Sequence, residues 1–381
     1  MKIIKVLLNI LLYILYIPFV YWKRHKFSTD NINSIVISAT HIGLGNAILL
    51  IPLLKTIKES YPDKNLYIIT STSVSMRLFK MYPFISSVFL LKIQRGKELI
   101  SGIQYYIQHI RPLKPDLYIS HFLHTLVDFS IWGFFSGATF RISYNTFLNG
   151  CLDTYTLPVD IKKHEVERNL EIAKILNARK KHIDLFVPLQ NGDVDFAMQF
   201  LELKNMINFD IILGIHPGCD ITSKYKRWPV DKFTFVAKEI SKIFNVKIVF
   251  FIGPGEEELL SAIQPIVSDK IVIATNLLLN QSIALVSRCN VFLCNDSGLM
   301  HVAAAFKIPT VALFGKTSTI KNKPWKTKHI IIQDVDNNKF TGVDFIDDID
   351  SIKRITTNEV IDKLSSFISD AKQNNLTIST K

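Results

Sequence analysis

The sequence predicts an α/β protein made of two Rossmann-like halves that face a cleft. Short runs of solidly apolar residues alternate with helical stretches, which is typical of parallel strands that helices cover on both faces. This alternation occurs twice along the chain, and the interruption lies near residues 188–193, where a strand-like LFVPL ends in a turn of Gly, Asn and Asp. A chain of 381 residues, 48% of them hydrophobic, is long enough for two domains of ordinary size.

An apolar segment precedes the two halves. Residues 1–22 are almost wholly apolar, and the basic run KRHK follows at residues 23–26. A cleaved signal peptide is disfavoured because no small-residue cleavage site follows. A weakly polar stripe at helical spacing favours a helix lying in the membrane plane, although the length also suits a spanning anchor. The stripe consists of Lys2, Lys5, Asn9, Tyr13 and Tyr16. We therefore expect residues 1–26 to be a membrane-associating or anchoring helix.

The first half is expected over residues 27–190. Its strands are predicted at residues 34–38, 66–70, 88–91 and 116–120, with a helix at residues 47–60, and the pattern loosens from residue 140 to 188. Gly43 and Gly45 lie in the loop after the first strand. This G-x-G is half of a dinucleotide fingerprint, but Ile48 occupies the third glycine position. The glycines therefore indicate only a tight turn or a close approach of the backbone to a ligand.

The second half is expected over residues 191–345, and residues 346–381 are expected to form a C-terminal helix and tail. A helix is predicted near residues 194–203, strands at 211–215 and 247–252, and a further helix from Val230. His216 and Gly218 directly follow the first of these strands, and Glu256 follows the second. A charged loop at residues 223–229 precedes the helix that begins at Val230.

Residues 291–315 contain the strongest local pattern of the second half. Two apolar runs are joined by an Ala-rich helix at residues 299–306, which predicts a βαβ unit. Asp296 and Ser297 occupy the position of a helix cap, and Gly298 leaves room for a ligand. A helix N-terminus at the end of a parallel strand favours an anion, and His301 lies one turn into this helix. The alternative is a capped helix with no ligand.

The charge balance favours an anionic partner. The chain has 45 basic and 33 acidic residues, a net charge of +12, which suits a nucleotide, a phosphorylated glycan or an acidic membrane surface. Nucleic acid is disfavoured because the sequence has no zinc spacing, basic helix or aromatic RNA-binding signature. The cysteines have no paired spacing and are expected to be reduced, buried thiols. They are Cys151, Cys219, Cys289 and Cys294.

Four motifs occur in order between residues 35 and 317: GLGNAILLIPLLKTIKESYP, HPG with KRWP, FFIGPGE, and NDSGLMHVAAAFKIPTVALFG. Together they resemble the signature blocks of glycosyltransferase family nine, the ADP-heptose:lipopolysaccharide heptosyltransferases. The resemblance implies a GT-B fold with the nucleotide-sugar donor in the second half and the acceptor mainly in the first. It also implies an inverting enzyme that needs no metal and no cofactor, uses ADP-heptose, and acts on a lipid-linked surface glycan at the cytoplasmic face of the inner membrane.

The resemblance also assigns roles to residues. Lys226 matches the family's phosphate-binding lysine, with Arg227 beside it, and Glu256 resembles the residue that binds the ribose. Asp296 is expected to hold its turn or bind sugar hydroxyls, and His301 to donate to the diphosphate or to pack in its helix. The complete set at the donor is His216, Gly218, Lys226, Arg227, Glu256, Asp296, Ser297, Gly298 and His301. Each also has an ordinary structural interpretation as a loop charge, a cap or a packed side chain.

One position departs from the family pattern. The family's first motif carries an aspartate after its second glycine, proposed as the general base, whereas this chain has Asn46. An amide cannot accept a proton at neutral pH. Either another group, such as the titratable His41 of the same loop, acts as base, or the nucleophile is activated differently, or the protein is a weak or inactive member of the family. The second hypothesis is a non-catalytic relative that binds nucleotide-sugar or glycan as a scaffold.

Overall fold

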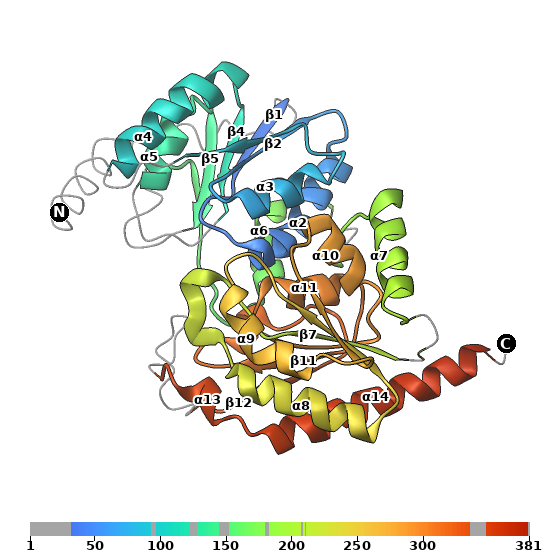
Figure 1. Ribbon diagram of the computed structural model, residues 1–381. Coiled ribbons are helices and arrows are strands. Elements are labelled where there is room, and N and C mark those ends of the chain that lie inside the picture. The colour runs from blue at the N-terminus through green and yellow to red at the C-terminus, as the bar shows by residue number, and fades with distance from the viewer. Residues whose placement is uncertain are drawn as a thin grey trace. The chain divides into compact units, whose positions relative to one another are not determined.

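The computed structural model describes the chain as two compact units, Met1–Ile183 and Asp184–Lys381. The residues described are 32–92, 97–121, 128–144, 152–179, 183–206, 209, 211–335 and 348–379. The division between the units falls a few residues before the boundary expected from the sequence. Each unit is a doubly wound α/β domain by itself (Figure 1).

Unit 1 contains a six-stranded parallel sheet in the order β3-β2-β1-β4-β5-β6. The order is that of a Rossmann fold, whose direction of winding reverses between β1 and β4. The strands are β1 (Ser34–Ser38), β2 (Asn65–Thr70), β3 (Ser87–Leu90), β4 (Leu117–Ser120), β5 (Phe140–Tyr144) and β6 (Tyr155–Leu157). The predictions of the first four strands are confirmed to within a residue at each end. Strands β1, β4 and β5 are buried along their whole length, which explains the apolar runs of β1 and β4. Strand β5 lies in the segment where the sequence pattern loosens, because it buries Arg141 and Ser143 among its apolar residues.

Helices cover this sheet, and the one after β1 is the longest of them among the described residues of unit 1. It is α2 (Leu44–Ser60), which begins before the predicted start at Ala47 because Gly43 already occupies the N-cap. Helix α2 packs against α6, where Asn169 Nδ2 donates to the Leu49 carbonyl at 3.1 Å. The other helical segments are α3 (Ser73–Lys80), α4 (Glu98–Tyr105), η2 (Tyr106–Ile110), η3 (Arg111–Leu113), α5 (Asp128–Phe135) and α6 (Glu165–Ile175).

Unit 2 repeats the same strand order in its own six-stranded parallel sheet, β12-β11-β10-β7-β8-β9. Here the winding reverses between β7 and β10, which pair in parallel although β8 and β9 lie between them in sequence. The strands are β7 (Ile212–His216), β8 (Lys247–Phe251), β9 (Ile271–Ala274), β10 (Val291–Asn295), β11 (Thr310–Phe314) and β12 (His329–Gln333). The predicted βαβ unit is confirmed as β10, α11 and β11.

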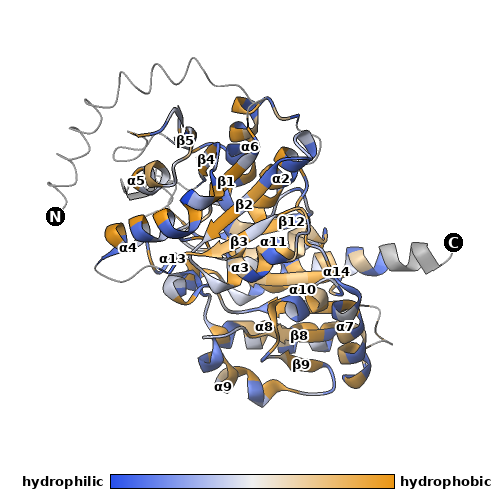
Figure 2. Ribbon diagram, turned by 90° about the horizontal axis from the view of Figure 1, so that it is seen from above, coloured by the Kyte–Doolittle hydropathy of each residue, from blue (hydrophilic) through white to orange (hydrophobic). Residues whose placement is uncertain are grey.

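The helices of unit 2 lie on both faces of this sheet (Figure 1). Helix α14 packs against α8, and both contribute to the main buried cluster with Phe233, Ile240, Leu364 and Ile368. Figure 2 shows the hydrophobic colour concentrated on strands such as β8 and β9, with hydrophilic turns at the outer faces of the helices. The helical segments are α7 (Asn191–Leu203), η4 (Ile221–Lys226), α8 (Val230–Ile243), η5 (Glu257–Leu259), α9 (Leu260–Ile263), η6 (Gln264–Ile266), α10 (Leu279–Val286), α11 (Gly298–Ala305), α12 (Thr319–Asn322), α13 (Ser351–Arg354) and α14 (Thr357–Ser379).

Three further expectations have different outcomes: one is wrong, one is met for the described residues, and one lies outside them. The strand-like segment LFVPL is not a strand: Pro188 has no N–H to donate to a ladder, and Phe186 is 46% exposed. Cys219, Cys289 and Cys294 are free and buried as expected, whereas Cys151 lies outside the described residues. The N-terminal helix expected at residues 1–26 also lies outside them. Within the part of the chain that the structure describes, no helix is both long and apolar enough to cross a bilayer.

Candidate functional site

Polar side chains gather where β7 and β10 end at the switch point of unit 2. His216 is the last residue of β7, and Asn295 is the last residue of β10. These strands are neighbours, with Cys294 opposite His216. In open α/β sheets, ligands bind outside the carboxyl ends of the strands at this point. The structure therefore brings residues from distant parts of the sequence to the edge of the sheet where a ligand is expected.

Asn295 ties the surrounding loops together. It is fully buried, and its Oδ1 accepts a hydrogen bond from the Trp228 backbone N–H at 3.1 Å. Its Nδ2 donates to the carbonyl oxygens of Pro217 at 2.8 Å and Gly218 at 3.2 Å. Trp228 is buried, packs against Phe233 and donates from Nε1 to the Ile355 carbonyl at 3.0 Å, so it anchors the loop by packing. The loop that carries Lys226 is thereby fixed against β10.

Asp296 and Lys226 form an ion pair at the centre of the site. Lys226 Nζ lies 2.7 Å from Asp296 Oδ2, and Thr317 Oγ1 donates to the same oxygen at 2.9 Å. Burial by itself would raise the pKa of Asp296, but the charge and hydrogen bond of Lys226 outweigh it, so the pKa is lowered. Burial would likewise lower the pKa of Lys226, yet attraction to Asp296 raises it. Both groups are therefore ionised at neutral pH.

A second polar chain runs from Ser297 through His216 to Glu256. His216 Nδ1 lies 2.9 Å from Ser297 Oγ, and His216 Nε2 lies 3.3 Å from Glu256 Oε2. Glu256 Oε2 also accepts from the Gly253 N–H at 2.7 Å. Burial acts to raise the pKa of Glu256, but the attraction and hydrogen bond of His216 outweigh it and lower the pKa. Glu256 is therefore a buried carboxylate held in one orientation.

The structure places Ser297 at the predicted cap position of α11, but its hydroxyl has another partner. Ser297 is the N-cap residue of α11, but its side chain makes no capping hydrogen bond. The hydroxyl pairs with His216 instead, because β7 ends directly beside it. Gly298 begins the helix, and His301 is buried one turn further on, where its charge contributes to the lowered pKa of Asp296. The first turn of α11 can thus offer backbone N–H groups to an anion.

Gly218 is required by Glu256 rather than by a turn. A Cβ atom at Gly218 would lie 1.9 Å from Glu256 Oε1 and 2.1 Å from its Cδ. The backbone at Gly218 is therefore closely approached by the carboxylate of Glu256.

Arg227 pairs with Glu258. Its Nη1 lies 2.7 Å from Glu258 Oε1, and Lys224 Nζ lies 2.7 Å from the same oxygen. Arg227 Nη2 also donates to the Cys219 carbonyl at 3.4 Å. This residue therefore joins the loop after β7 to the segment that follows β8.

The loop after β1 in unit 1 contains the expected acceptor residues. His41 adopts a left-handed backbone with φ of 58°, and its N–H donates to Ser71 Oγ at 2.8 Å. Desolvation by surrounding atoms lowers the pKa of His41, although the residue as a whole is exposed to solvent. Gly43 is the N-cap of α2, and Gly45 and Asn46 lie in the first turn of that helix. The helix has no acidic residue in that turn.

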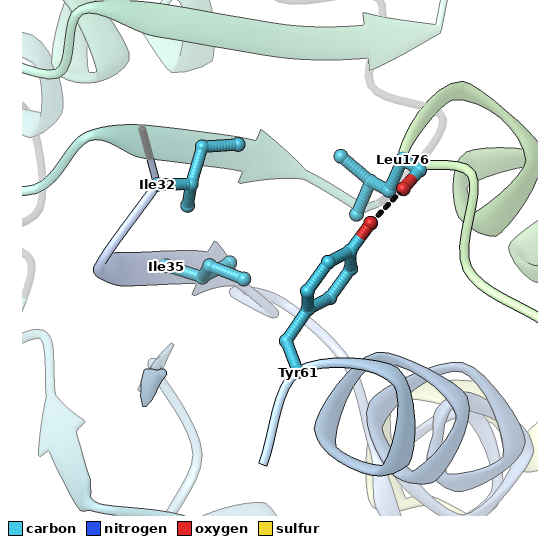
Figure 3. A pocket seen from close by; sticks show the side chains of 4 residues that line it. All are labelled: Ile32, Ile35, Tyr61 and Leu176. Atoms are coloured by element: carbon cyan, nitrogen blue, oxygen red, sulfur yellow. Dashed lines mark hydrogen bonds between the residues drawn. The ribbon is translucent and has the colours of Figure 1, made fainter. Parts of the chain in front are cut away.

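A small apolar pocket elsewhere in unit 1 does not suit a nucleotide. Ile32, Ile35, Tyr61 and Leu176 line it (Figure 3). The Tyr61 hydroxyl donates to the Leu176 carbonyl, so the polar group of the lining is already engaged. The described residues also contain no cluster of three or more His, Cys, Asp or Glu side chains that could hold a metal ion.

Sequence reasoning missed several members of the site in unit 2. The sequence motifs contain Asn295 without indicating its contacts, and they indicate no role for Thr317, Lys316 or Tyr225. A usable signal was present, because Lys316 and Thr317 directly follow the apolar strand β11, at the edge where parallel strands place their ligands. The partners themselves could not be identified without the sheet order.

The protein has two six-stranded sheets, and both have the strand order of a Rossmann fold. One of them has an ordered polar site at its switch point. These features define a two-domain α/β protein of the kind that binds nucleotides. The family comparison makes this specific: the model of glycosyltransferase family 9 (heptosyltransferase) matches residues 123–344, more than half of the chain. The chain belongs to this family and is a glycosyltransferase.

Individual proteins agree with the family match. The chain is similar to lipooligosaccharide heptosyltransferase 2 of Campylobacter jejuni, with 25% identity over 290 residues that cover 75% of this chain and 82% of the relative. Its fold resembles a glycosyltransferase family 9 structure from Veillonella parvula, with a TM-score of 0.72 and 20% identity over 89% of this chain and 97% of the other. It also resembles the structure of the ADP-heptose lipopolysaccharide heptosyltransferase II of Escherichia coli, with a TM-score of 0.67 and 20% identity. The match covers 89% of this chain and 99% of the other.

Proposed function

We propose that this enzyme transfers a heptose from ADP-heptose to the core of a lipopolysaccharide or lipooligosaccharide, with inversion at the anomeric carbon and without a metal ion. The observation that carries the proposal is the site in unit 2, where Lys226 and the N-terminus of α11 meet beside the buried carboxylate of Glu256. The Campylobacter jejuni relative, a heptosyltransferase, supports heptose as the sugar, and the Escherichia coli ADP-heptose heptosyltransferase II supports ADP-heptose as the donor.

The arrangement of the site suits a nucleoside diphosphate sugar. A carboxylate such as Glu256 can accept hydrogen bonds from both ribose hydroxyls, and His216 holds it in place. Lys226 and the backbone N–H groups of the first turn of α11 supply positive charge for the phosphates. Asp296 holds Lys226 at 2.7 Å, and we propose that it also binds sugar hydroxyls. These groups replace the metal ion that many nucleotide enzymes use.

The proposed reaction is a displacement at the anomeric carbon. An acceptor hydroxyl attacks from the face opposite the diphosphate, the bond from the sugar carbon to the phosphate oxygen breaks, and its electron pair remains on the released ADP. The acceptor hydroxyl loses one proton. We propose that His41 receives this proton, because Asn46 cannot and because the lowered pKa of His41 keeps its imidazole neutral at working pH.

The membrane surface is part of the proposal because the acceptor is linked to lipid. We infer that residues 1–26 hold the enzyme at the cytoplasmic face of the inner membrane, either in the membrane plane or as a single anchor. The basic excess of the chain would attract anionic lipid headgroups. Exposed apolar side chains of unit 1, Ile100, Ile107 and Phe134, support a further apolar contact.

A second candidate function follows from Asn46. If no group replaces the missing aspartate, the protein binds nucleotide-sugar or glycan without turnover and acts as a scaffold in the same pathway. The donor site is the same in both cases, so binding alone cannot separate them.

The experiment measures binding and turnover in parallel on the full-length protein. Calorimetry with ADP should give saturable binding, and radiolabelled ADP-heptose with a heptose-deficient core as acceptor should give a labelled glycan. The rate should be unchanged after chelation with EDTA, and the product should show the inverted anomer by NMR. Binding without transfer would support the scaffold, and the absence of ADP binding would refute the donor site.

A further inference from the structure

Hydroxyl groups that follow β2 hold the turn that follows β1 in unit 1. Strands β1 and β2 are parallel neighbours with Ser38 opposite Ile69, so the residues after them leave the sheet at the same edge. Ser71 directly follows β2 and is half-buried, and its Oγ accepts a hydrogen bond from the His41 backbone N–H at 2.8 Å. The backbone of His41 is therefore bound to the segment after β2.

Ile42, the next residue of this turn, is held from the same segment. Its carbonyl oxygen accepts two hydrogen bonds, from Thr72 Oγ1 at 2.9 Å and from Ser75 Oγ at 2.8 Å. Ile42 and Ser75 are fully buried. Thr72 is the N-cap of α3, and its Oγ1 also accepts from the Ser75 N–H at 3.4 Å. Three hydroxyl groups thus join the turn at residues 41–42 to the start of α3.

The conformation of this turn explains why such contacts matter. His41 has a φ of 58°, in the left-handed region, where the Cβ of an L residue crowds the following carbonyl oxygen. A residue other than glycine remains in such a conformation when the surrounding structure holds it there. The hydroxyl contacts bind the N–H of His41 and the carbonyl of Ile42, so they fix the direction of the His41 Cα–Cβ bond. The position of the imidazole therefore depends on the segment after β2.

We propose that Ser71 is a positioning residue for His41, whose backbone it holds so that the imidazole meets the acceptor hydroxyl. The acceptor proton passes to an imidazole nitrogen of His41, and Ser71 exchanges no proton in this step. The inference rests on the proposed function, because it takes His41 as the group that receives the proton. A catalytic group that is misplaced by about 1 Å can lose on the order of 100-fold in rate.

The test measures heptose transfer by the full-length protein, with kcat and the KM for ADP-heptose determined separately. Ser71→Ala should lower kcat about 10- to 100-fold, the scale of a misplaced catalytic group, while KM for the donor and the affinity for ADP stay as in the parent. Ser71→Thr keeps the hydroxyl and should recover most of the rate. The matched control is Ser73→Ala, which removes a hydroxyl from an exposed residue of the same segment and should leave kcat unchanged.

A double-mutant cycle tests whether Ser71 acts through His41. In the His41→Ala background, Ser71→Ala should lower kcat no further, because the group that it positions is gone. An equal loss in both backgrounds, no loss in the parent, or a loss of the same size in Ser73→Ala would overturn the role of Ser71 and leave His41 as the base. If His41→Ala transfers heptose at the parent rate, or the parent transfers none, the proposed function fails and the inference falls with it.

Amide hydrogen exchange tests the contact itself without turnover. The His41 amide should exchange faster in Ser71→Ala than in the parent or in Ser73→Ala, because its acceptor has been removed. Equal exchange in the three proteins would contradict the inference. The melting temperature of Ser71→Ala should stay near that of the parent, and a large fall would make Ser71 a residue of the fold instead of a positioning residue.

Discussion

Gly218→Ala should disrupt the Glu256 carboxylate, and the structure fixes the size of the effect. The added Cβ would lie 1.9 Å from Glu256 Oε1, far inside van der Waals contact. The carboxylate cannot easily move, because Oε2 accepts from the Gly253 N–H at 2.7 Å and faces His216 Nε2 at 3.3 Å, and the side chain is 6% exposed. Overpacking and the loss of one charged hydrogen bond should together lower the free energy of unfolding of Gly218→Ala by about 2–4 kcal/mol relative to the parent.

The measurement is a double-mutant cycle on unfolding and on ADP affinity. Gly218→Ala should lower the melting temperature of unit 2 by several degrees, on the scale of roughly 2–4 °C per kcal/mol for a domain of this size. It should also weaken ADP binding, because the carboxylate proposed to hold the ribose is displaced. In the Glu256→Ala background the same substitution should cost much less, because the clashing group is gone. The reasoning would be refuted if Gly218→Ala lowered the free energy of unfolding equally in the parent and in Glu256→Ala, or did not lower it in the parent.

Two further predictions concern the base and the membrane. His41→Ala should reduce turnover by about 10²–10⁴-fold with little change in ADP affinity, whereas Asn46→Asp should alter the rate only modestly. Transfer of radiolabelled sugar to the acceptor measures both rates. A large gain in rate from Asn46→Asp would instead indicate that the natural chain lacks its base. Because desolvation lowers the pKa of His41, the neutral imidazole persists to lower pH than a free imidazole would. Turnover should therefore begin to fall at a lower pH than the titration of a free imidazole. This acidic fall in rate should be absent in His41→Ala. Deleting residues 1–26 should release the protein from the membrane, and the shortened protein should still bind ADP but act poorly on lipid-linked acceptor. Sedimentation with vesicles measures the membrane binding. Retention on vesicles would assign membrane binding to the basic surface of the rest of the chain.

Much of the fold could be predicted because its strands are buried on both faces. A strand such as β10 or β11 has no solvent-facing side, so its sequence is a continuous apolar run that stands out from its neighbours. The same reasoning failed for β6, a strand of three half-buried residues that carries no such run. It also failed for LFVPL, which has the apolar residues of a strand but not the backbone donors.

The sequence by itself determined which residues could form a donor site, because their positions at strand ends and their family motifs do not depend on distant contacts. Only the tertiary structure decided their partners. His216 and Ser297 are 81 positions apart, and Lys226 and Asp296 are 70 apart. They meet because the sheet order places β7 beside β10, and such a pairing leaves no local pattern in the chain. For the same reason, the sequence indicates the cap position of Ser297 but not that its hydroxyl pairs with His216 of the neighbouring strand.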